Sequence, residues 1–163
     1  MGYAGAMTQR EFPEAPLVGV GGIVVDGLGR VLLIRRGAEP MKGRWSIPGG
    51  LVELGETLTA AVEREMAEET GLRVEAVALV ELLDRIYREE KEGVEQVRYH
   101  YVLADYLCRV VEGEARAGSD ASEVAWARRP EWMESNPYEL QDFAREIVDK
   151  GWRMAREAGI HAA

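Results

Sequence analysis

The sequence has one cysteine, two histidines and no long apolar run. Cys108 has no second cysteine to pair with, so an internal disulfide is excluded, and the residue reads as part of a core. No stretch approaches the roughly 20 apolar residues of a membrane-spanning helix. Residues 1–16 also lack the basic and apolar segments of a signal peptide. We therefore expect a cytoplasmic protein with no membrane partner.

Basic residues are scarce relative to acidic ones. The 20 Lys and Arg residues face 29 Asp and Glu residues, which leaves a formal net charge of -9. Nucleic-acid-binding domains usually present a basic face, so a nucleic-acid polymer is not an expected partner. A chain of 163 residues with 47% apolar content is the size of one compact domain. We expect a flexible N-terminal arm over residues 1–16 and a single domain over residues 17–163, and the sequence leaves a homodimer open.

The first half of the chain predicts a β-hairpin, a long loop and a helix. Residues 17–26 and 29–36 are β-branched and apolar runs separated by a Gly-rich turn. Residues 37–56 are rich in Gly and Pro, which predicts a loop with a short strand near its middle. The helix that follows should begin after Thr57 as N-cap and end at Gly71, the expected left-handed C-cap.

The second half predicts three strands and a closing helix. Strands are expected over residues 72–87, 97–110 and 122–127, and an amphipathic helix over residues 138–159. The charged segment 88–96 is expected to be a solvated hairpin tip. The chain should therefore fold as an α/β protein.

Three glutamates share one face of the first predicted helix. Glu65, Glu68 and Glu69 lie at spacings of i, i+3 and i+4, which stack side chains on a helix. Glu65 and Glu69 fall on the apolar stripe, Glu68 flanks it, and Glu63 lies about 120° away on the expected solvated face. Inward-facing carboxylates need compensation, because burying unpaired charge is unfavourable.

The expected compensation is a cation. Arg64 is placed to neutralise one carboxylate. Clustered oxygen ligands suit a hard divalent ion, so Mg²⁺ is the predicted cofactor, with Mn²⁺ as an alternative. No His or Cys lies nearby to indicate zinc. The preceding loop adds backbone groups near Gly50 and a further carboxylate at Glu56, which favours a phosphate ester as the ligand of the metal.

The order Gly50, five residues, Glu56, seven residues and then "REMAEETGL" matches every specified position of the Nudix box, over residues 50–72. The chain therefore resembles the Nudix hydrolase family, which includes the MutT-like phosphohydrolases. The resemblance implies an α/β/α sandwich with a mixed β-sheet and a loop-helix-loop catalytic motif. It also implies Mg²⁺-dependent cleavage of a pyrophosphate bond in a small-molecule nucleotide.

The resemblance also implies roles for the matching residues. By position, the metal ligands would be Glu65, Glu68, Glu69 and the Gly50 carbonyl. Arg64 would orient a glutamate, and Glu56 would be a supporting acid. The general base is Glu65 or a carboxylate on a later loop.

For the later loop, Glu123 is the first choice and Asp120 the second, although a turn of this composition is acidic in any case.

Substrate-binding residues are suggested by position and chemistry. Arg36 resembles an arginine that contacts substrate phosphate in MutT-like members, while Arg35 should point to the other side of its strand. Trp45 is suited either to stacking on a base or to closing the core. Tyr87 occupies a place where members acting on ADP-ribose often carry proline; it resembles dinucleoside polyphosphate hydrolases there, or is an ordinary strand end. Along residues 98–101, alternation lets one pair, such as Arg98 with its i+2 neighbour, reach a base or ribose.

These observations favour a pyrophosphohydrolase acting on a nucleoside diphosphate linked to a second group, such as ADP-ribose or a nucleotide sugar. One alternative is a MutT-like pyrophosphatase for deoxynucleoside triphosphates, including 8-oxo forms. Another is a non-catalytic nucleotide sensor, which the complete set of box glutamates disfavours. An acidic helix that serves only protein contacts is disfavoured because its carboxylates continue the apolar stripe.

Overall fold

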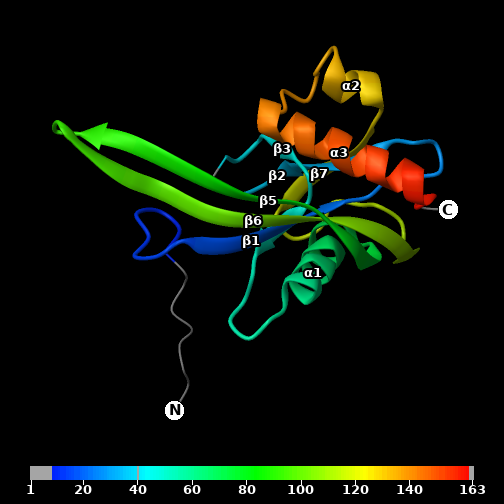
Figure 1. Ribbon diagram of the computed structural model, residues 1–163, viewed down its shortest axis with the longest axis horizontal. Helices are drawn as coiled ribbons and strands as arrows, with labels where there is room; N and C mark the ends of the chain where they lie inside the picture. The colour runs from blue at the N-terminus through cyan, green and yellow to red at the C-terminus, as the bar shows by residue number, and fades with distance from the viewer. Residues whose placement is uncertain (1–8, 40, 162–163) are drawn as a thin grey trace.

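The computed structural model describes residues 9–39 and 41–161. Two β-sheets lie between helices on opposite sides, which confirms the predicted α/β class with mixed sheets (Figure 1). The elements in chain order are β1 (Leu17–Ile23), β2 (Val31–Arg36), β3 (Trp45–Ser46), β4 (Gly49–Leu51), α1 (Leu58–Thr70), β5 (Arg73–Lys91), β6 (Val94–Glu112), β7 (Ala121–Ala127), α2 (Arg129–Met133) and α3 (Asp142–Ala158).

The strands of each sheet come from distant parts of the chain. One sheet has the order β4-β1-β6-β5, and the other has the order β3-β2-β7. Strand β1 runs parallel to β6 and antiparallel to β4, whereas β2 is antiparallel to both of its neighbours. This order places the Gly-rich segment of β4 beside the centre of β1, where it contacts Glu65 and Glu69 in the second half of α1.

Alternating side chains supply two hydrophobic cores. Successive residues of a strand point to opposite faces. Val31 and Leu33 of β2 accordingly belong to the core that includes Ile147 of α3, while Leu32 belongs to the core that includes Met66 of α1. Helix α3 therefore covers one side of the strands and α1 the other.

Helix α1 has the predicted ends. The Thr57 Oγ1 atom accepts a hydrogen bond of 3.2 Å from the Ala60 N–H, and Gly71 closes the helix with φ of 72°. The helix lies very close to β1 at Gly22. A Cβ atom at Gly22 would lie 2.6 Å from the Met66 sulfur, so the absence of a side chain sets the depth at which α1 packs.

Strands β5 and β6 form a long ribbon that extends past the body of the molecule (Figure 1). The predicted solvated hairpin tip lies in segment 88–96, but the loop itself is shorter than predicted, because strand pairing continues to Lys91 and Val94. The turn contains Glu92 and Gly93, both with positive φ, as tight hairpin turns require. The short helix α2 was not foreseen from the sequence either.

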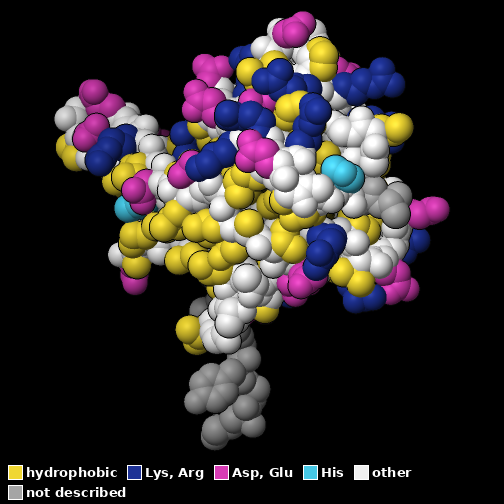
Figure 2. Space-filling model, turned by 45° about the vertical axis from the view of Figure 1, so that its right-hand side comes forward, with side chains coloured by type: hydrophobic (Ala, Val, Ile, Leu, Met, Phe, Trp, Pro, Cys, Tyr) yellow, Lys and Arg dark blue, Asp and Glu magenta, His cyan; other side chains and the backbone are white. Residues whose placement is uncertain are grey.

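The exposed surface bears on the expected partners. Exposed large hydrophobic residues include Val18, Leu82 and Ile86, and hydrophobic side chains form a band on the face seen in Figure 2. A homodimer stays a prediction. Within the described residues, no helix is both long and apolar enough to cross a membrane.

The predicted N-terminal arm lies partly outside the described residues, which begin at residue 9. Its described part contacts β6, because the Phe12 N–H donates a hydrogen bond of 2.8 Å to the Arg98 carbonyl.

The close packing of α3 on β1 can be tested at Gly151. A Cβ atom there would lie 2.5 Å from Ile23 Cδ1 and 3.3 Å from Ile23 Cβ, which cannot rotate away. We expect Gly151→Ala to lower the free energy of unfolding, because overpacking costs about 1–3 kcal/mol and the gain in helix propensity is at most about 1 kcal/mol. Urea denaturation measures the change. Glu157→Ala, at an exposed position of the same helix, is the control, and a Gly151→Ala protein more stable than the wild type would contradict this packing.

Candidate active site

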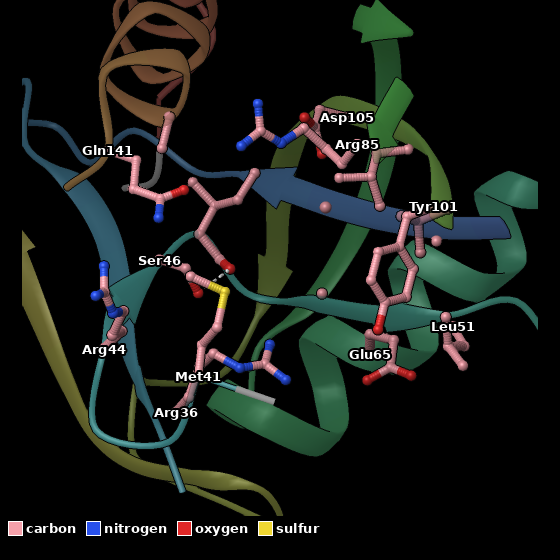
Figure 3. A pocket seen from close by; sticks show the side chains of 18 of the residues that line it. Arg36, Met41, Arg44, Ser46, Leu51, Glu65, Arg85, Tyr101, Asp105 and Gln141 are labelled. Atoms are coloured by element: carbon pink, nitrogen blue, oxygen red, sulfur yellow. Dashed lines mark hydrogen bonds between the residues drawn. The ribbon is translucent and has the colours of Figure 1, made fainter. Parts of the chain in front are cut away.

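A pocket of about 460 Å³ opens between the β5–β6 ribbon, strands β1 and β4, the loop before β3 and the start of α3 (Figure 3). Its volume lies in the range of small-molecule sites. Figure 3 shows Glu65 below Tyr101 on one side of the pocket and Arg36 and Arg44 across from them. The pocket thus joins the acidic helix to basic and aromatic side chains from distant parts of the chain.

The helix and the glycine loop meet at Gly50. A Cβ atom at this position would overlap the Glu65 carboxylate. Only glycine therefore lets that carboxylate lie directly against the β4 backbone. Next to it, the Gly49 N–H donates a hydrogen bond of 2.8 Å to Glu69 Oε2, so α1 and β4 are joined through a second glutamate.

Arg64 binds three glutamates at once. Its Nε atom is 2.7 Å from Glu56 Oε1, and its Nη1 atom is 2.8 Å from Glu65 Oε1 and 3.3 Å from Glu68 Oε2. Its Nη2 atom donates to the Leu51 carbonyl at 3.0 Å. The hydrogen bond from Arg64 lowers the pKa of Glu56 to about 2, and the hydrogen bond to Glu56 raises the pKa of Arg64. These contacts are the ones expected of a residue that orients glutamates.

The three clustered glutamates differ in burial. Glu69 is only 5% exposed, and burial raises its pKa to about 7. Burial also raises the pKa of Glu65, against the lowering effect of Arg64. The Glu68 side chain is 49% exposed and does not line the pocket. The predicted inward orientation therefore holds for Glu65 and Glu69, with Glu68 at the rim.

The helical pattern placed Glu63 on the solvated face of α1, but the residue is not simply solvated. Its Oε1 atom accepts a hydrogen bond of 3.0 Å from the Ala76 N–H, and the residue is half-buried. Ala76 adjoins an irregularity in the pairing of β5 with β6, which leaves a backbone donor for this side chain. Glu63 therefore links α1 to β5 on the side away from the pocket.

The acidic groups of the pocket fit a hard cation. Across residues 9–39 and 41–161, no three His, Cys, Asp or Glu side chains already converge at metal-ligand spacing. Glu65, Glu69 and Asp120 nevertheless line one pocket. After burial, the charges of Glu65 and Asp120 are among the causes that raise the pKa of Glu69. Oxygen donors that disfavour one another's ionisation match Mg²⁺ or Mn²⁺, which would relieve their repulsion.

The structure reverses the order of the two later-loop candidates. Asp120 lines the pocket, whereas Glu123 does not. The Glu123 carboxylate is 2.7 Å from the Arg35 guanidinium, in an exposed ion pair on the other side of β2 and β7. Cross-strand pairing of Arg35 with Glu123 places both side chains on the same face of the sheet, which turns Glu123 away from the glutamates.

Two of the predicted substrate-binding residues line the pocket from the loop side. Arg36 does so, and its charge is one of the influences that lower the pKa of Glu69. Arg35 points to the opposite face, as strand alternation predicts. Trp45 lines the pocket and also packs edge-on against Tyr138, with ring centroids 5.1 Å apart. Both interpretations of this tryptophan are therefore compatible with its position.

On the ribbon side, Tyr87 lines the pocket and Arg98 does not. The Arg98 guanidinium forms ion pairs with Glu11 at 2.8 Å and with Glu89 at 3.4 Å. Its neighbours Tyr99 and Tyr101 line the pocket in its place. Alternation along β6 was predicted correctly, but the pair that faces the pocket is the tyrosine pair.

Several lining residues were not found from the sequence. They are Arg10, Arg44, Arg85, Asp105 and Gln141. Asp105 interrupts the apolar run of residues 101–108, which is the one local signal that could have identified it. The others carry no local signal, because they reach the pocket only through the arrangement of the ribbon, the loop and the start of α3.

Comparisons with known proteins identify the family of the chain. Residues 15–150 match the NUDIX domain. The chain is 38% identical over 109 residues to an ADP-ribose pyrophosphatase from Methanocaldococcus jannaschii, covering 67% of this chain and 60% of that protein. It is 37% identical over 114 residues to a MutT-like protein from Streptomyces ambofaciens, covering 70% of this chain and 65% of that protein. The chain thus spans less than two thirds of the length of both relatives.

A solved structure agrees as well. The crystal structure of a MutT NUDIX hydrolase from Burkholderia pseudomallei superimposes with a TM-score of 0.67 at 30% identity, covering 84% of this chain and 98% of that chain.

The ion pair between Glu56 and Arg64 predicts a specific pH dependence. Because the folded-state pKa of Glu56 is about 2, against an ordinary 4.5, the pair stabilises the fold above about pH 4.5 and ceases to do so as the pH falls towards 2. We expect Glu56→Gln to lower the free energy of unfolding at neutral pH by on the order of 1–2 kcal/mol, after allowance for solvent screening. Near pH 2, the two proteins should be equally stable.

Thermal melts across this pH range measure the difference. Glu53→Gln, at an exposed position of the same loop, should follow the wild type throughout. A stability difference between wild type and Glu56→Gln that did not shrink on acidification would show that the pair is not the cause.

Proposed function

The chain belongs to the NUDIX family, and from that premise we propose that it is a pyrophosphohydrolase that cleaves the pyrophosphate bond of a nucleoside diphosphate linked to a second group, such as ADP-ribose or a nucleotide sugar. The observation that carries the proposal is the single pocket in which Glu65, Glu69 and Arg36 lie together with aromatic side chains of the ribbon. Its size and mixed lining suit a ligand with a charged middle and less polar ends. The 38% identity to an ADP-ribose pyrophosphatase supports the same substrate class.

The proposed roles follow from the contacts of each residue. Arg36 lines the same pocket as Glu65 and Glu69 and binds a substrate phosphate through its guanidinium. Arg64 positions Glu65 and Glu56, so that the Glu65 carboxylate stays against the Gly50 backbone. Glu65 or Asp120 takes a proton from the attacking water, since both line the pocket. Asp120 replaces Glu123 as the later-loop candidate, because Glu123 is bound to Arg35.

The cofactor is proposed on the chemistry of the donor set. Glu65, Glu69 and the Gly50 carbonyl would hold Mg²⁺ or Mn²⁺, with Glu68 completing the set from the rim. When bound, the ion would neutralise phosphate charge and lower the pKa of a coordinated water. A cation at this position also explains why two carboxylates are buried side by side.

A MutT-like pyrophosphatase for deoxynucleoside triphosphates, including 8-oxo forms, is the second candidate. The likeness to the MutT-like protein and to the MutT NUDIX hydrolase favours it. A non-catalytic nucleotide sensor is a weaker candidate, because Glu56, Arg64 and all three clustered glutamates are present. Arg64 contacts every one of these glutamates except Glu69.

The experiment that tests the function is a hydrolysis assay with Mg²⁺ over ADP-ribose, nucleotide sugars, dinucleoside polyphosphates, and deoxynucleoside triphosphates with their 8-oxo forms. AMP together with ribose phosphate is the product expected from ADP-ribose. A nucleoside monophosphate with pyrophosphate would instead establish the second candidate. A chelator should abolish turnover and added Mn²⁺ should restore it. Full turnover in metal-depleted protein, or none with any substrate, would refute the proposal.

The role of the buried glutamate is tested by Glu69→Gln. The amide keeps an oxygen for the Gly49 N–H but removes a charge that repels Glu65. Without metal, the variant should therefore be as stable as the wild type or slightly more stable. Its turnover should fall by roughly two to four orders of magnitude, because a metal ligand is lost.

The matched control is Glu63→Gln on the same helix. Its amide oxygen can still accept from the Ala76 N–H, and the residue lies away from the pocket. Metal-dependent kinetics and melts of the metal-free proteins should separate the two variants. Equal turnover in both would mean that the glutamate face of α1 does not hold the metal.

A further inference from the structure

The pocket contains buried polar atoms that the proposed chemistry does not use. In the part of the chain that the structure describes, three buried side-chain atoms lack a hydrogen-bond partner: Arg85 Nε, the Tyr101 hydroxyl and Gln141 Oε1. All three residues line this one pocket. Buried polar groups in proteins are nearly always hydrogen-bonded, because an unpaired one destabilises the fold. Their gathering in one cavity indicates that a ligand supplies the missing partners.

Asp105 adds a fourth unpaired group. It is only 5% exposed, and its side chain has no hydrogen-bond donor among residues 9–39 and 41–161. Burial raises the pKa of its carboxyl to about 7. Any side chain at Gly21 would collide with this carboxyl, so β1 is kept bare where Asp105 points. A carboxyl group in this setting is unfavourable for the fold unless it meets a donor from outside the chain.

Three of these four residues, all except Tyr101, lie on the side of the pocket away from the glutamates of α1. Arg85 comes from β5, Asp105 from β6 and Gln141 from the N-cap of α3. We call these three residues the inner end of the pocket. Figure 3 shows Arg85 and Asp105 at the top of the view and Glu65 at the opposite side, with Tyr101 on the strand between them. A substrate whose pyrophosphate lies near Glu65 would therefore extend one of its ends towards the inner end.

We propose that the inner end binds the hydrogen-bonding edge of a purine base, with Asp105 and Gln141 accepting from N–H groups of the ring and Arg85 donating to a ring nitrogen or carbonyl. The inference rests on the proposed function in one respect, namely that the substrate is a nucleotide. It adds the residues that select the base.

The walls of the inner end favour a flat ring over a sugar. Ile47, Leu103, Phe143 and Ile147 line the pocket beside the three polar residues. The Arg85 guanidinium lies 3.6 Å from the centre of the Phe143 ring, so its plane is supported from one side. Apolar walls with a few buried donors and acceptors are complementary to a base, which has apolar faces and a polar edge. A ribose is not flat, and apolar walls offer its hydroxyl groups no hydrogen-bond partners.

The spacing of the polar groups favours a purine over a pyrimidine. Arg85 pairs with Tyr101 across the ribbon, and Asp105 lies four residues further along β6. The two backbone positions are therefore roughly 13 Å apart. The side chains of the inner end thus come from positions spread along the ribbon and from the start of α3, and a purine presents donors and acceptors at more positions of its edge than a pyrimidine does.

The test compares Asp105→Asn with a matched control, Asp84→Asn. Asp84 is exposed on the ribbon and pairs with Val102, which alternates with the pocket-facing residues of β6. Binding of AMP, GMP, CMP, UMP and ribose 5-phosphate is measured by calorimetry without metal. We expect Asp105→Asn to weaken binding of AMP or GMP above pH 7 on the order of tenfold or more, because the charge of the carboxylate is lost and one of its two acceptor oxygens is replaced by an N–H donor. Asp84→Asn should bind as the wild type does, and Arg85→Met should show a similar loss.

Stability separates a ligand-binding role from a structural one. Since the Asp105 carboxyl is buried and unpaired, Asp105→Asn should melt at the same temperature as the wild type or higher. A lower melting temperature with unchanged nucleotide affinity would show that Asp105 is structural. Wild-type affinity for CMP or UMP that matches or exceeds that for AMP and GMP, or an equal loss for ribose 5-phosphate, would overturn the base assignment, as would no binding of AMP or GMP at millimolar concentration.

The same variants keep this inference apart from the proposed function. If the wild type hydrolyses a nucleotide and Asp105→Asn shows the same KM as Asp84→Asn, the inference fails and the function stands. If no nucleotide is hydrolysed but purine binding depends on Asp105, the function fails and the binding site stands. If the proposed function and the base-binding site both hold, Asp105→Asn should raise KM for the purine substrate about tenfold with a smaller effect on kcat. This is expected when an interaction made equally in the ground state and the transition state is lost.

Discussion

The contacts of one guanidinium make the rest of the site feasible. Arg64 bonds to Glu56, Glu65 and Glu68 and to the Leu51 carbonyl, and so joins α1 to the loop that precedes it. Without a cation at this point, glutamates at i, i+3 and i+4 would repel one another and weaken the helix. With Arg64 in place, the loop before α1 and the acidic face of the helix are held in one arrangement, and Glu65 can lie against the backbone of β4.

Arg64 does not neutralise every carboxylate of the pocket, and Glu69, which it does not contact, is informative. Glu69 accepts one hydrogen bond from a backbone N–H and is influenced by the charge of Arg36, but burial and the like charges of Glu65 and Asp120 raise its pKa. Such a group stabilises the fold less than a neutral side chain of similar shape would. The inner end has the same character, with Asp105 and the Arg85 Nε atom both buried and unpaired. Both ends of the pocket therefore hold polar groups that a ligand would satisfy better than the protein does.

The two ends of the pocket are built from different parts of the chain. This bears on which residues are typical of the family and which ones contact the substrate. The glutamate end comes from one continuous segment, in which α1 and β4 meet through glycines that allow close approach. The inner end is assembled from β5, β6 and the start of α3. Changes in the ribbon can therefore alter the ligand without disturbing the glutamates. This separation is compatible with the similarity of this chain to relatives that carry different names.

Helix α1, its caps at Thr57 and Gly71, and the inward direction of Glu65 and Glu69 could be predicted from the sequence, because these features depend on contacts between residues a few positions apart. By contrast, it is the packing of distant strands that turns Asp120 rather than Glu123, and Tyr99 rather than Arg98, towards the pocket. The same packing makes segment 88–96 mostly paired strand. The register between distant strands sets those outcomes, and a shift of one residue exchanges the two faces of a strand. The inner end was unreadable for the same reason, since Arg85, Asp105 and Gln141 become neighbours only when β5, β6 and α3 pack around one cavity.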